Sequence, residues 1–322
     1  MPGEPADVVM FGPKTIIEEA LTKAGLRLHK AWAAPDQDAF IASIAPKVRA
    51  IAAVAGHGPV DGALMARFPK LEIVSSFGVG YDHIDAKWAG QHGVVVTNTP
   101  DVLNEEVADT ALGLLLCTVR QLPQAERYLR AGNWPKHGDY QLTPSLRDRT
   151  AGIVGMGRIG KAIARRLDAM QVPVVYHTRR PTAVAYRHYP NLVDRARDAD
   201  VLIVLTPGGA ATKNLVGAAV LEALGPNGIL INVARGSVVD EAALVKALQD
   251  QTILSAGLDV FVNEPNVPAE LIAMENVVLL PHVGSASEPT RRAMDTLVAD
   301  NIIAWFAGKG PLTPVPETPV KK

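Results

Sequence analysis

Three side chains of complementary chemistry, Arg235, Glu264 and His282, each follow an apolar stretch in the second half of the 322-residue sequence. Singly, each has an ordinary explanation: a solvated arginine, a turn residue before a proline, a structural histidine. Together they suit the reduction of a ketone. A histidine can donate the proton that the carbonyl oxygen needs as hydride reaches the carbon, and a carboxylate beside the imidazole favours its protonated form. An arginine can hold a substrate carboxylate and polarise the carbonyl.

These side chains can meet only if the apolar stretches are neighbouring strands of one parallel sheet. The apolar runs predict six strands, at residues 152–154, 172–176, 201–205, 229–233, 253–258 and 277–280, with helices between most of them. Strands that alternate with helices form a parallel sheet covered on both faces, and this number is typical of a full Rossmann sheet. Because ligands bind outside the carboxyl ends of such strands, all three side chains fall at the ligand edge.

A glycine-rich turn opens the same predicted sheet. Gly155, Gly157 and Gly160 have the G-x-G-x-x-G spacing, after the first strand and before a helical pattern over 161–170. The first glycine permits a tight turn, the second lets the backbone approach a pyrophosphate, and the third lets helix and strand pack closely. The alternative is an ordinary strand-to-helix turn, but the flanking strands favour a dinucleotide site.

The end of the second strand indicates which dinucleotide binds. NAD-dependent enzymes carry an acidic residue there, which bonds the ribose 2′-hydroxyl. This sequence has His177, Thr178, Arg179 and Arg180 instead, with no Asp or Glu. Arginine pairs bidentately with phosphate, so the segment favours the 2′-phosphate of NADPH over NADH. The alternative is that Arg179 and Arg180 form a solvated turn.

The first hundred residues predict another α/β unit, of flavodoxin-like type. Its predicted strands are at 8–11, 26–32, 50–55, 71–75 and 94–97, and its predicted helices are at 14–24, 35–44, 61–67 and 85–91. The pattern then breaks, and a long helix capped by Asn104 is expected over 104–121. A polar segment, 130–149, leads to the glycine turn, and a last helix, 289–307, precedes a proline-rich tail.

The composition argues against several classes of protein. The formal net charge is -1, from 32 basic and 33 acidic residues, which disfavours a partner that is a nucleic acid or a membrane surface. The chain has one cysteine, Cys117, so it forms no intramolecular disulfide and suits a reducing cytoplasm. The sequence shows no signal peptide and no run long enough to span a membrane.

Over most of its length the sequence resembles the D-isomer-specific 2-hydroxyacid dehydrogenases, and most of all their NADPH-dependent glyoxylate/hydroxypyruvate reductase branch. The segments that carry the resemblance are 75–85, 106–110, 155–160, 233–236, 257–261, 263–265 and 281–285. The resemblance implies that His282 is the proton donor, Glu264 its partner and Arg235 the substrate anchor. Asp259 is the rival partner of the imidazole, and the spacing alone cannot choose between the two carboxylates.

The resemblance also implies further contacts with substrate and cofactor. The backbone at Val79 and Gly80 would hold the substrate carboxylate. Asp259 and Thr110 would lie near the nicotinamide. The full set of implied cofactor contacts is Gly155, Gly157, Arg158, Ile159, Gly160, His177, Thr178, Arg179, Arg180, Thr206, Pro207, Val233, Ala234, Asp259, Thr110 and Gly284. No metal is expected.

The implied architecture has two Rossmann-like domains with a cleft between them. A discontinuous, flavodoxin-like substrate domain would comprise residues 1–99 and 287–322, and a doubly wound, parallel-sheet NAD(P)-binding domain would comprise 100–286. Relatives are usually homodimers built around the long helix and the segment after it. Trp134 in that segment either reaches the partner's active site or only packs in the dimer contact.

We therefore expect an NADPH-dependent, cytoplasmic reductase of small 2-ketoacids, which converts glyoxylate to glycolate or hydroxypyruvate to D-glycerate. Other family activities are alternatives: phosphoglycerate, phenylpyruvate, formate or phosphite dehydrogenases. A dinucleotide-sensing corepressor is an alternative of another class. Selectivity for side-chain size would depend on residues such as His57, Phe77 and Trp134.

Overall fold

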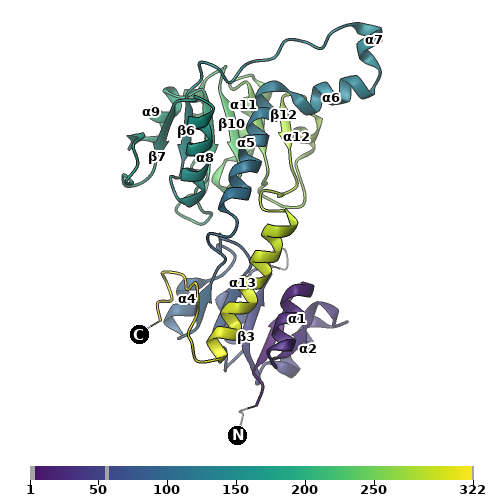
Figure 1. The fold of residues 1–322 in the computed structure, drawn as a ribbon, viewed down its shortest axis with the longest axis vertical. Helices are drawn as coiled ribbons and strands as arrows, with labels where there is room; N and C mark the ends of the chain where they lie inside the picture. Colours follow the sequence, from purple (N-terminus) through teal and green to yellow (C-terminus); the bar gives the residue numbers. More distant parts are fainter. Residues whose placement is uncertain (1–3, 55–57, 321–322) are drawn as a thin grey trace. The chain divides into compact units, whose positions relative to one another are not determined.

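The computed structural model describes residues 4–54 and 58–320 (Figure 1). The chain divides into two compact units, Met1–Leu103 with Ser287–Lys322, and Asn104–Ala286. The first unit is therefore discontinuous in the sequence. The boundary predicted at 99/100 lies in the short segment between the last strand of the first unit and the helix that opens the second.

The first unit is a five-stranded parallel sheet in the order β2-β1-β3-β4-β5, the flavodoxin-like order that the sequence predicts. Its strands are β1 (Asp7–Met10), β2 (Arg27–Lys30), β3 (Val48–Ala53), β4 (Ile73–Ser76) and β5 (Val95–Thr97). Its helices are α1 (Thr15–Lys23), η1 (Ala31–Ala33), α2 (Gln37–Ile44), α3 (Gly62–Ala66), α4 (Ala86–Gln91) and α13 (Glu288–Phe306).

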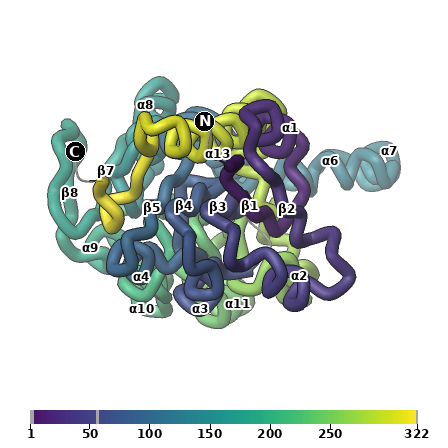
Figure 2. The backbone as a smooth tube through the Cα atoms, turned by 90° about the horizontal axis from the view of Figure 1, so that it is seen from below, coloured from purple at the N-terminus to yellow at the C-terminus, as the bar shows by residue number. Residues whose placement is uncertain are grey.

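Helices cover both faces of this sheet. Figure 2 shows α1 and α13 on one face, with α2, α3 and α4 on the other. The three inner strands are therefore almost wholly buried and can be nearly continuous apolar runs. Asp36, Asp61 and Asp85 accept hydrogen bonds from first-turn N–H groups of α2, α3 and α4, which fixes where these helices begin.

The C-terminal tail joins the sheet of the first unit. After α13 the chain forms an antiparallel bridge between Pro314 and Thr97, and the N–H of Val315 donates to the carbonyl of Val96 at 2.9 Å. The hydroxyl of Thr318 accepts from the N–H of Val96. The tail thus covers part of the exposed edge of β5, and its extended form agrees with its proline content.

The second unit is a seven-stranded parallel sheet in the order β12-β11-β10-β9-β6-β7-β8. Its strands are β6 (Ala151–Val154), β7 (Val174–His177), β8 (Arg187–Tyr189), β9 (Val201–Val204), β10 (Ile229–Asn232), β11 (Ser255–Leu258) and β12 (Val277–Leu279). The chain runs outward from β6 to β8 and then returns to β9, so the order reverses between β6 and β9. Ligands bind at such a switch point.

The doubly wound fold is as predicted, but the expected number of six strands is wrong. The sequence did not reveal β8, because Arg187, His188 and Tyr189 contain no apolar run. An edge strand has one neighbour only, so it needs less apolar surface than a central strand. All six predicted strands are present, with their ends shifted by one or two residues.

Helices cover both faces of the second sheet. They are α5 (Asn104–Arg120), α6 (Leu122–Arg130), α7 (Asn133–His137), α8 (Arg158–Ala169), α9 (Leu192–Arg197), α10 (Ala218–Leu224), η2 (Gly236–Val238), α11 (Glu241–Gln249) and α12 (Ala269–Ala273). Helices α5 and α8 pack on one face, and α9, α10 and α11 pack on the other. Alternate strand residues serve the two cores, as Ile203 and Leu202 do.

Two helices, α6 and α7, form an arm that extends from the second unit (Figure 1). The sequence predicted only a polar segment over 130–149, so α7 corrects that prediction. The arm exposes the large apolar side chains of Leu122 (48%), Leu129 (55%) and Trp134 (56%), and Leu142, in the segment just after α7, is 100% exposed. Helices of 9 and 5 residues are only marginally stable on their own in water.

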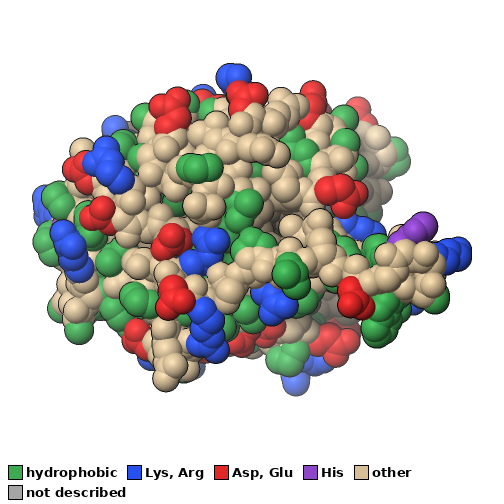
Figure 3. All heavy atoms as spheres, turned by 90° about the horizontal axis from the view of Figure 1, so that it is seen from above, with side chains coloured by type: hydrophobic (Ala, Val, Ile, Leu, Met, Phe, Trp, Pro, Cys, Tyr) green, Lys and Arg blue, Asp and Glu red, His purple; other side chains and the backbone are tan. Residues whose placement is uncertain are grey.

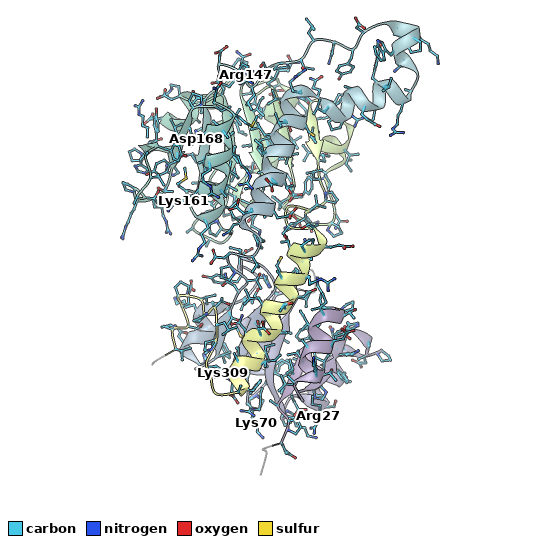
Figure 4. All side chains as sticks on the ribbon, in the orientation of Figure 1. Arg27, Lys70, Arg147, Lys161, Asp168 and Lys309 are labelled. Carbon is cyan, nitrogen blue, oxygen red and sulfur yellow. The ribbon has the colours of Figure 1, made fainter. Side chains whose placement is uncertain are left out.

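Charged side chains of both signs are interspersed over the face seen in Figure 3. On α8, for example, Lys161 and Asp168 are both exposed (Figure 4). Within the described ranges, no helix combines the length and apolar character needed to cross a membrane.

Candidate active site

The residues singled out in the second unit lie along the carboxyl edge of its sheet. In sheet order they are His282 and Gly284 after β12, Asp259 and Glu264 after β11, Val233, Ala234 and Arg235 after β10, Thr206 and Pro207 after β9, the glycine turn after β6, and residues 177–180 at the end of β7. The turn and the proposed acid–base group therefore share one edge, with the switch point between them.

His282 and Glu264 form a hydrogen-bonded pair. The Nδ1 atom of His282 lies 2.7 Å from Oε2 of Glu264. Since an ionised carboxylate only accepts hydrogen bonds, Nδ1 carries a hydrogen and Nε2 is left for a ligand. The side chains of His282 and Glu264 are 46% and 35% exposed, so a ligand can reach them. His282 has φ of +54°, a left-handed conformation that is uncommon outside glycine.

The surroundings of Glu264 keep its carboxyl ionised. Burial raises the pKa of Glu264, but hydrogen bonds from His282 and from the N–H of Phe261, together with the positive charges of His282 and Arg235, outweigh burial and hold the pKa below its usual value. The N–H of Phe261 donates to Oε1 at 3.0 Å. Glu264 therefore presents a fixed negative charge to the imidazole.

Asp259, the other candidate partner of the imidazole, bonds the backbone and not the ring. Asp259 is 2% exposed, and its carboxylate accepts hydrogen bonds from the N–H groups of Val283 at 2.7 Å and Gly284 at 2.8 Å. Burial raises the pKa of Asp259, although these two hydrogen bonds oppose the shift. The carbonyl of Asp259 also accepts from the N–H of His282 at 2.9 Å. Asp259 thus shapes the loop that carries His282, whereas Glu264 contacts the ring.

The strand end before Arg235 is fixed by the buried side-chain amide of Asn232, which was not among the predicted site residues. Asn232 is 1% exposed, donates to the carbonyl of Arg235 at 3.1 Å and accepts from the N–H of Ala234 at 3.1 Å. A Cβ at Gly236 would lie 1.9 Å from the carbonyl carbon of Phe261, so this turn packs against the segment that leads to Glu264. A polar residue at the end of an otherwise apolar strand was the available signal.

The glycine turn has the geometry of a cradle for an anion. Gly155 has φ of +107°, and a Cβ there would lie 3.0 Å from the carbonyl carbon of Leu205. A Cβ at Gly160 would lie 2.3 Å from the carbonyl oxygen of Gly155, so α8 packs directly on the turn. A Cβ at Gly157 would meet no atom within 4 Å. No side chain caps α8, whose first N–H groups can therefore bind phosphate.

Neighbouring residues complete this edge. The Oγ1 atom of Thr206 is buried and has no hydrogen-bond partner within the described part of the chain, so it is available to a ligand. Thr110, on α5, donates to the carbonyl of Gly284 at 3.2 Å and so contacts the loop that holds His282. Ala234 is buried, Val233 and Ile159 are partly exposed, and Pro207 is exposed. Arg158, at the start of α8, is exposed.

The end of β7 carries two unpaired cations. Arg179 and Arg180 are exposed, and neither side chain bonds to a group in the described ranges. The hydroxyl of Thr178 donates to the carbonyl of Arg180 at 2.6 Å, which tightens the turn. His177 donates from Nδ1 to the carbonyl of Tyr189, and burial, with the nearby charge of Arg195, lowers its pKa. These residues fit a 2′-phosphate, and residues 177–180 include no Asp or Glu that would repel it.

The loop implied to hold the substrate carboxylate belongs to the first unit. Val79 and Gly80 follow β4, and the carbonyl of Val79 accepts from Nδ2 of Asn98 at 2.9 Å. Phe77, before this loop, is 4% exposed, with Nζ of Lys14 3.9 Å from its ring centroid. His57 lies outside the described residues. Trp134, on the arm of the second unit, donates from Nε1 to Asp139 at 3.0 Å.

Comparison with known proteins decides the family. Residues 112–284 match the NAD binding domain of the D-isomer specific 2-hydroxyacid dehydrogenases. The chain belongs to this family. Residues 155, 157, 160, 235, 259, 264 and 282 all lie within the matched range. No group of three or more His, Cys, Asp or Glu side chains in the described ranges is placed to hold a metal ion.

Several relatives of this dehydrogenase are similar over nearly its whole length. Glyoxylate/hydroxypyruvate reductase A of Arabidopsis thaliana is 45% identical over 97% of this chain and 99% of the relative. The hydroxyphenylpyruvate reductase of Plectranthus scutellarioides is 44% identical over 97% of this chain and 99% of its own. Among solved structures, an NADPH-dependent glyoxylate/hydroxypyruvate reductase from Sinorhizobium meliloti, in complex with NADP and malonate, is 51% identical, covers 99% of both chains and has a TM-score of 0.92.

Proposed function

We propose that this dehydrogenase uses NADPH to reduce small 2-ketoacids, glyoxylate to glycolate and hydroxypyruvate to D-glycerate. The observation that carries the proposal is the His282–Glu264 pair, joined at 2.7 Å, on the sheet edge that also bears the glycine turn. The names of the relatives from Arabidopsis thaliana and Sinorhizobium meliloti support these substrates and this cofactor.

The residues at the glycine turn and at the end of β7 would hold the cofactor. N–H groups at the start of α8 and the hydroxyl of Thr206 would bind its phosphates and ribose, and Arg179 and Arg180 would bind the 2′-phosphate. When bound, NADPH supplies the hydride that reaches the carbonyl carbon. The open space at Gly157 and the unpartnered Oγ1 of Thr206 fit such a ligand.

The proton in this reaction would come from His282. Its Nδ1–H stays directed at Glu264, so the transferred proton leaves from Nε2 to the carbonyl oxygen. The ionised carboxylate of Glu264 stabilises the imidazolium before transfer and fixes the plane of the ring afterwards. The guanidinium of Arg235 would hold the substrate carboxylate and draw charge from the carbonyl oxygen. The backbone of Val79 and Gly80 would also hold the carboxylate.

A direct assay tests the proposal. Oxidation of NADPH and of NADH is followed with glyoxylate, hydroxypyruvate, pyruvate and hydroxyphenylpyruvate. We expect turnover with NADPH and with glyoxylate or hydroxypyruvate, and a loss of roughly 100-fold or more in kcat for His282→Ala, because a positioned acid contributes on the order of 10²–10⁴. A variant that keeps near-normal turnover would refute the role of His282.

A second candidate substrate is hydroxyphenylpyruvate, because the relative from Plectranthus scutellarioides is named for its reduction. The same panel separates the two, since the substrate with the higher kcat/KM is the better match for the site. A dinucleotide-sensing protein without turnover is also separated, because it would bind NADPH and oxidise none with any of these ketoacids.

We further propose that Met1–Leu103 with Ser287–Lys322 is the substrate-binding domain and that Asn104–Ala286 binds the cofactor. The exposed apolar side chains of the α6–α7 arm support a homodimer in which the arm is covered by a second copy. A single cysteine, Cys117, suits the cytoplasm, where we place the enzyme.

A further inference from the structure

The loop at Val79 and Gly80 is oriented by one side chain of the same unit. Asn98 donates from Nδ2 to the carbonyl of Val79 at 2.9 Å. That carbonyl and the N–H of Gly80 belong to one planar, trans peptide and therefore point in opposite directions. A bond that fixes the carbonyl on the side of Asn98 also fixes the N–H of Gly80 on the opposite side, as a donor for a ligand.

The backbone of Asn98 is in turn held by the C-terminal tail. Its N–H donates to the carbonyl of Thr313 at 3.3 Å, and its carbonyl accepts from Oγ1 of Thr313 at 2.6 Å. These two bonds clamp the main chain on both sides of the Asn98 side chain. The direction of its amide group therefore depends on where Thr313 lies.

Thr313 is fixed by a buried residue of α13. Asn301 is 0% exposed and donates from Nδ2 to Oγ1 of Thr313 at 2.9 Å. Its Oδ1 accepts from the N–H groups of Leu312 at 2.9 Å and Thr313 at 3.0 Å. A chain of hydrogen bonds thus runs from the interior of α13 through the tail and Asn98 to the carbonyl of Val79.

The two ends of the same loop have their own anchors. Gly78 and Thr99 share two hydrogen bonds. The N–H of Gly78 donates to the hydroxyl of Thr99 at 3.0 Å, and the N–H of Thr99 donates to the carbonyl of Gly78 at 2.9 Å. The hydroxyl of Tyr81 donates to Oε2 of Glu317 in the tail at 3.0 Å. Burial, with the hydrogen bond and charge of Glu317, raises the pKa of Tyr81 to about 12, so Tyr81 remains a donor. The loop is therefore held before, within and after the Val79–Gly80 peptide.

We propose that Asn98 is the positioning residue for the substrate carboxylate, and that the tail through Thr313 sets its direction. The inference rests on the proposed function, in which the N–H of Gly80 binds that carboxylate. Asn98 itself would not contact the substrate. It aligns the donor before binding, so the substrate does not have to supply the free energy of ordering the loop.

The test separates orientation from packing with two Asn98 variants of different size. Asn98→Ala removes the side chain, whereas Asn98→Asp keeps its size and replaces the N–H donor by an acceptor that repels the Val79 carbonyl. For both we expect a rise on the order of tenfold or more in KM for glyoxylate and in Ki for oxalate, since a hydrogen bond to a charged group is worth about that factor. We expect kcat and the KM for NADPH to stay within about twofold, as for a loss of uniform substrate binding.

Further measurements exclude a general loss of structure. Thr313→Val keeps the shape of the side chain and removes the hydroxyl that bonds Asn98, so a smaller rise in KM is expected with an unchanged kcat. The melting temperature should fall somewhat, because the buried Asn301 also loses its acceptor. Gln91→Ala, an exposed amide on α4, is the matched control and should behave as wild type. In NMR spectra, oxalate should shift the amide signal of Gly80 in the wild type and much less in Asn98→Asp.

The outcomes distinguish this inference from the proposed function. If the wild type reduces glyoxylate and Asn98→Asp does so with an unchanged KM and an unchanged Ki for oxalate, Asn98 only fills space and the inference is wrong. If kcat and both KM values change together with a lower melting temperature, its role is structural and the inference is also wrong. If the wild type neither reduces nor binds any of the ketoacids, the proposed function fails and the inference falls with it.

Discussion

At the scale of single residues, the site depends on the different hydrogen-bond partners of two carboxylates, Asp259 and Glu264. Both follow β11, but Asp259 uses its oxygens on the N–H groups of Val283 and Gly284, while Glu264 bonds the imidazole of His282. The spacing in the sequence placed both carboxylates at the ligand edge without separating them, and only the family resemblance favoured Glu264. Their assignment depends on which way each side chain turns, and the loop between them decides that.

The first prediction concerns Glu264→Gln, which keeps the shape of the side chain and removes its charge. The imidazolium of His282 then lacks a negative partner, so we expect kcat for reduction to fall by roughly 10- to 100-fold. Because the pKa of Glu264 is held below its usual value, the wild type should lose activity on acidification only below the range of an ordinary glutamate.

These expectations are checked by pH profiles of kcat and kcat/KM for both proteins. Glu241→Gln, an exposed carboxylate that accepts from the N–H of Val262, is a control for the nearby loop. A variant profile that coincides with that of the wild type would remove Glu264 from the mechanism.

The second prediction concerns a buried cation in the second unit. Arg195, on α9, is 0% exposed, and its three guanidinium nitrogens have no hydrogen-bond partner in the described ranges. Burial lowers the pKa of Arg195 to about 9, although Tyr189 opposes the shift. Since the folded state disfavours the charge, this group costs stability at neutral pH, and the cost diminishes only as the pH rises above about 9.

We therefore expect Arg195→Met to raise the free energy of unfolding at pH 7, on the order of 1–4 kcal/mol, because it replaces an unpaired buried charge by an apolar chain of similar length. The gain should be smaller at pH 10. Thermal unfolding at both pH values measures it, with exposed Arg197→Met as the matched control. A lower melting temperature for Arg195→Met would show that the guanidinium has a partner that stabilises the fold.

At the scale of elements, the sequence predicted the central strands better than the edge strand, the arm and the contacts between loops. Central strands such as β9 and β10 are apolar because both of their faces are covered by helices. Their positions in the structure agree with the predicted ones to within one or two residues. The edge strand β8 and helix α7 were missed, because β8 buries only the side chain of Tyr189 and α7 buries none. Contacts between distant loops, as between Asn98 and Thr313, leave no periodic pattern in the sequence and could not be predicted.

The third prediction concerns the turn after β7, where two neighbouring arginines are unpaired. Arg179→Ala should lower kcat/KM for NADPH by on the order of tenfold, because a charge-assisted bond to the 2′-phosphate is lost. The value for NADH should not change, since NADH lacks that phosphate. The preference of the wild type should also weaken as ionic strength rises.

Steady-state kinetics with both cofactors test this expectation. Arg165→Ala, on α8, removes an exposed arginine that pairs with Glu105 and serves as the control. A wild type that prefers NADH, or an unchanged ratio in Arg179→Ala, would contradict the assignment of the turn to the 2′-phosphate.

At the scale of the whole molecule, the α6–α7 arm is notable for the apolar surface that it exposes. The family resemblance predicts a homodimer at this segment. In the structure Leu129 on α6 is 55% exposed, and Leu142, just after α7, is 100% exposed. Such surface on a thin arm is costly in water unless another protein covers it. A second copy is the simplest partner, because symmetric dimers are the commonest assemblies.

The fourth prediction is that charge on the arm separates the copies. The double variant Leu129→Glu/Leu142→Glu places two carboxylates on the apolar surface, and burial of an unpaired charge opposes association. The wild type should therefore sediment with twice the mass of one chain, and the variant with the mass of one. The control is Ile272→Glu on α12, which is 66% exposed and lies outside the arm, and which should remain dimeric. If the arm only protects the fold of its own chain, the double variant would stay dimeric and lose melting temperature instead.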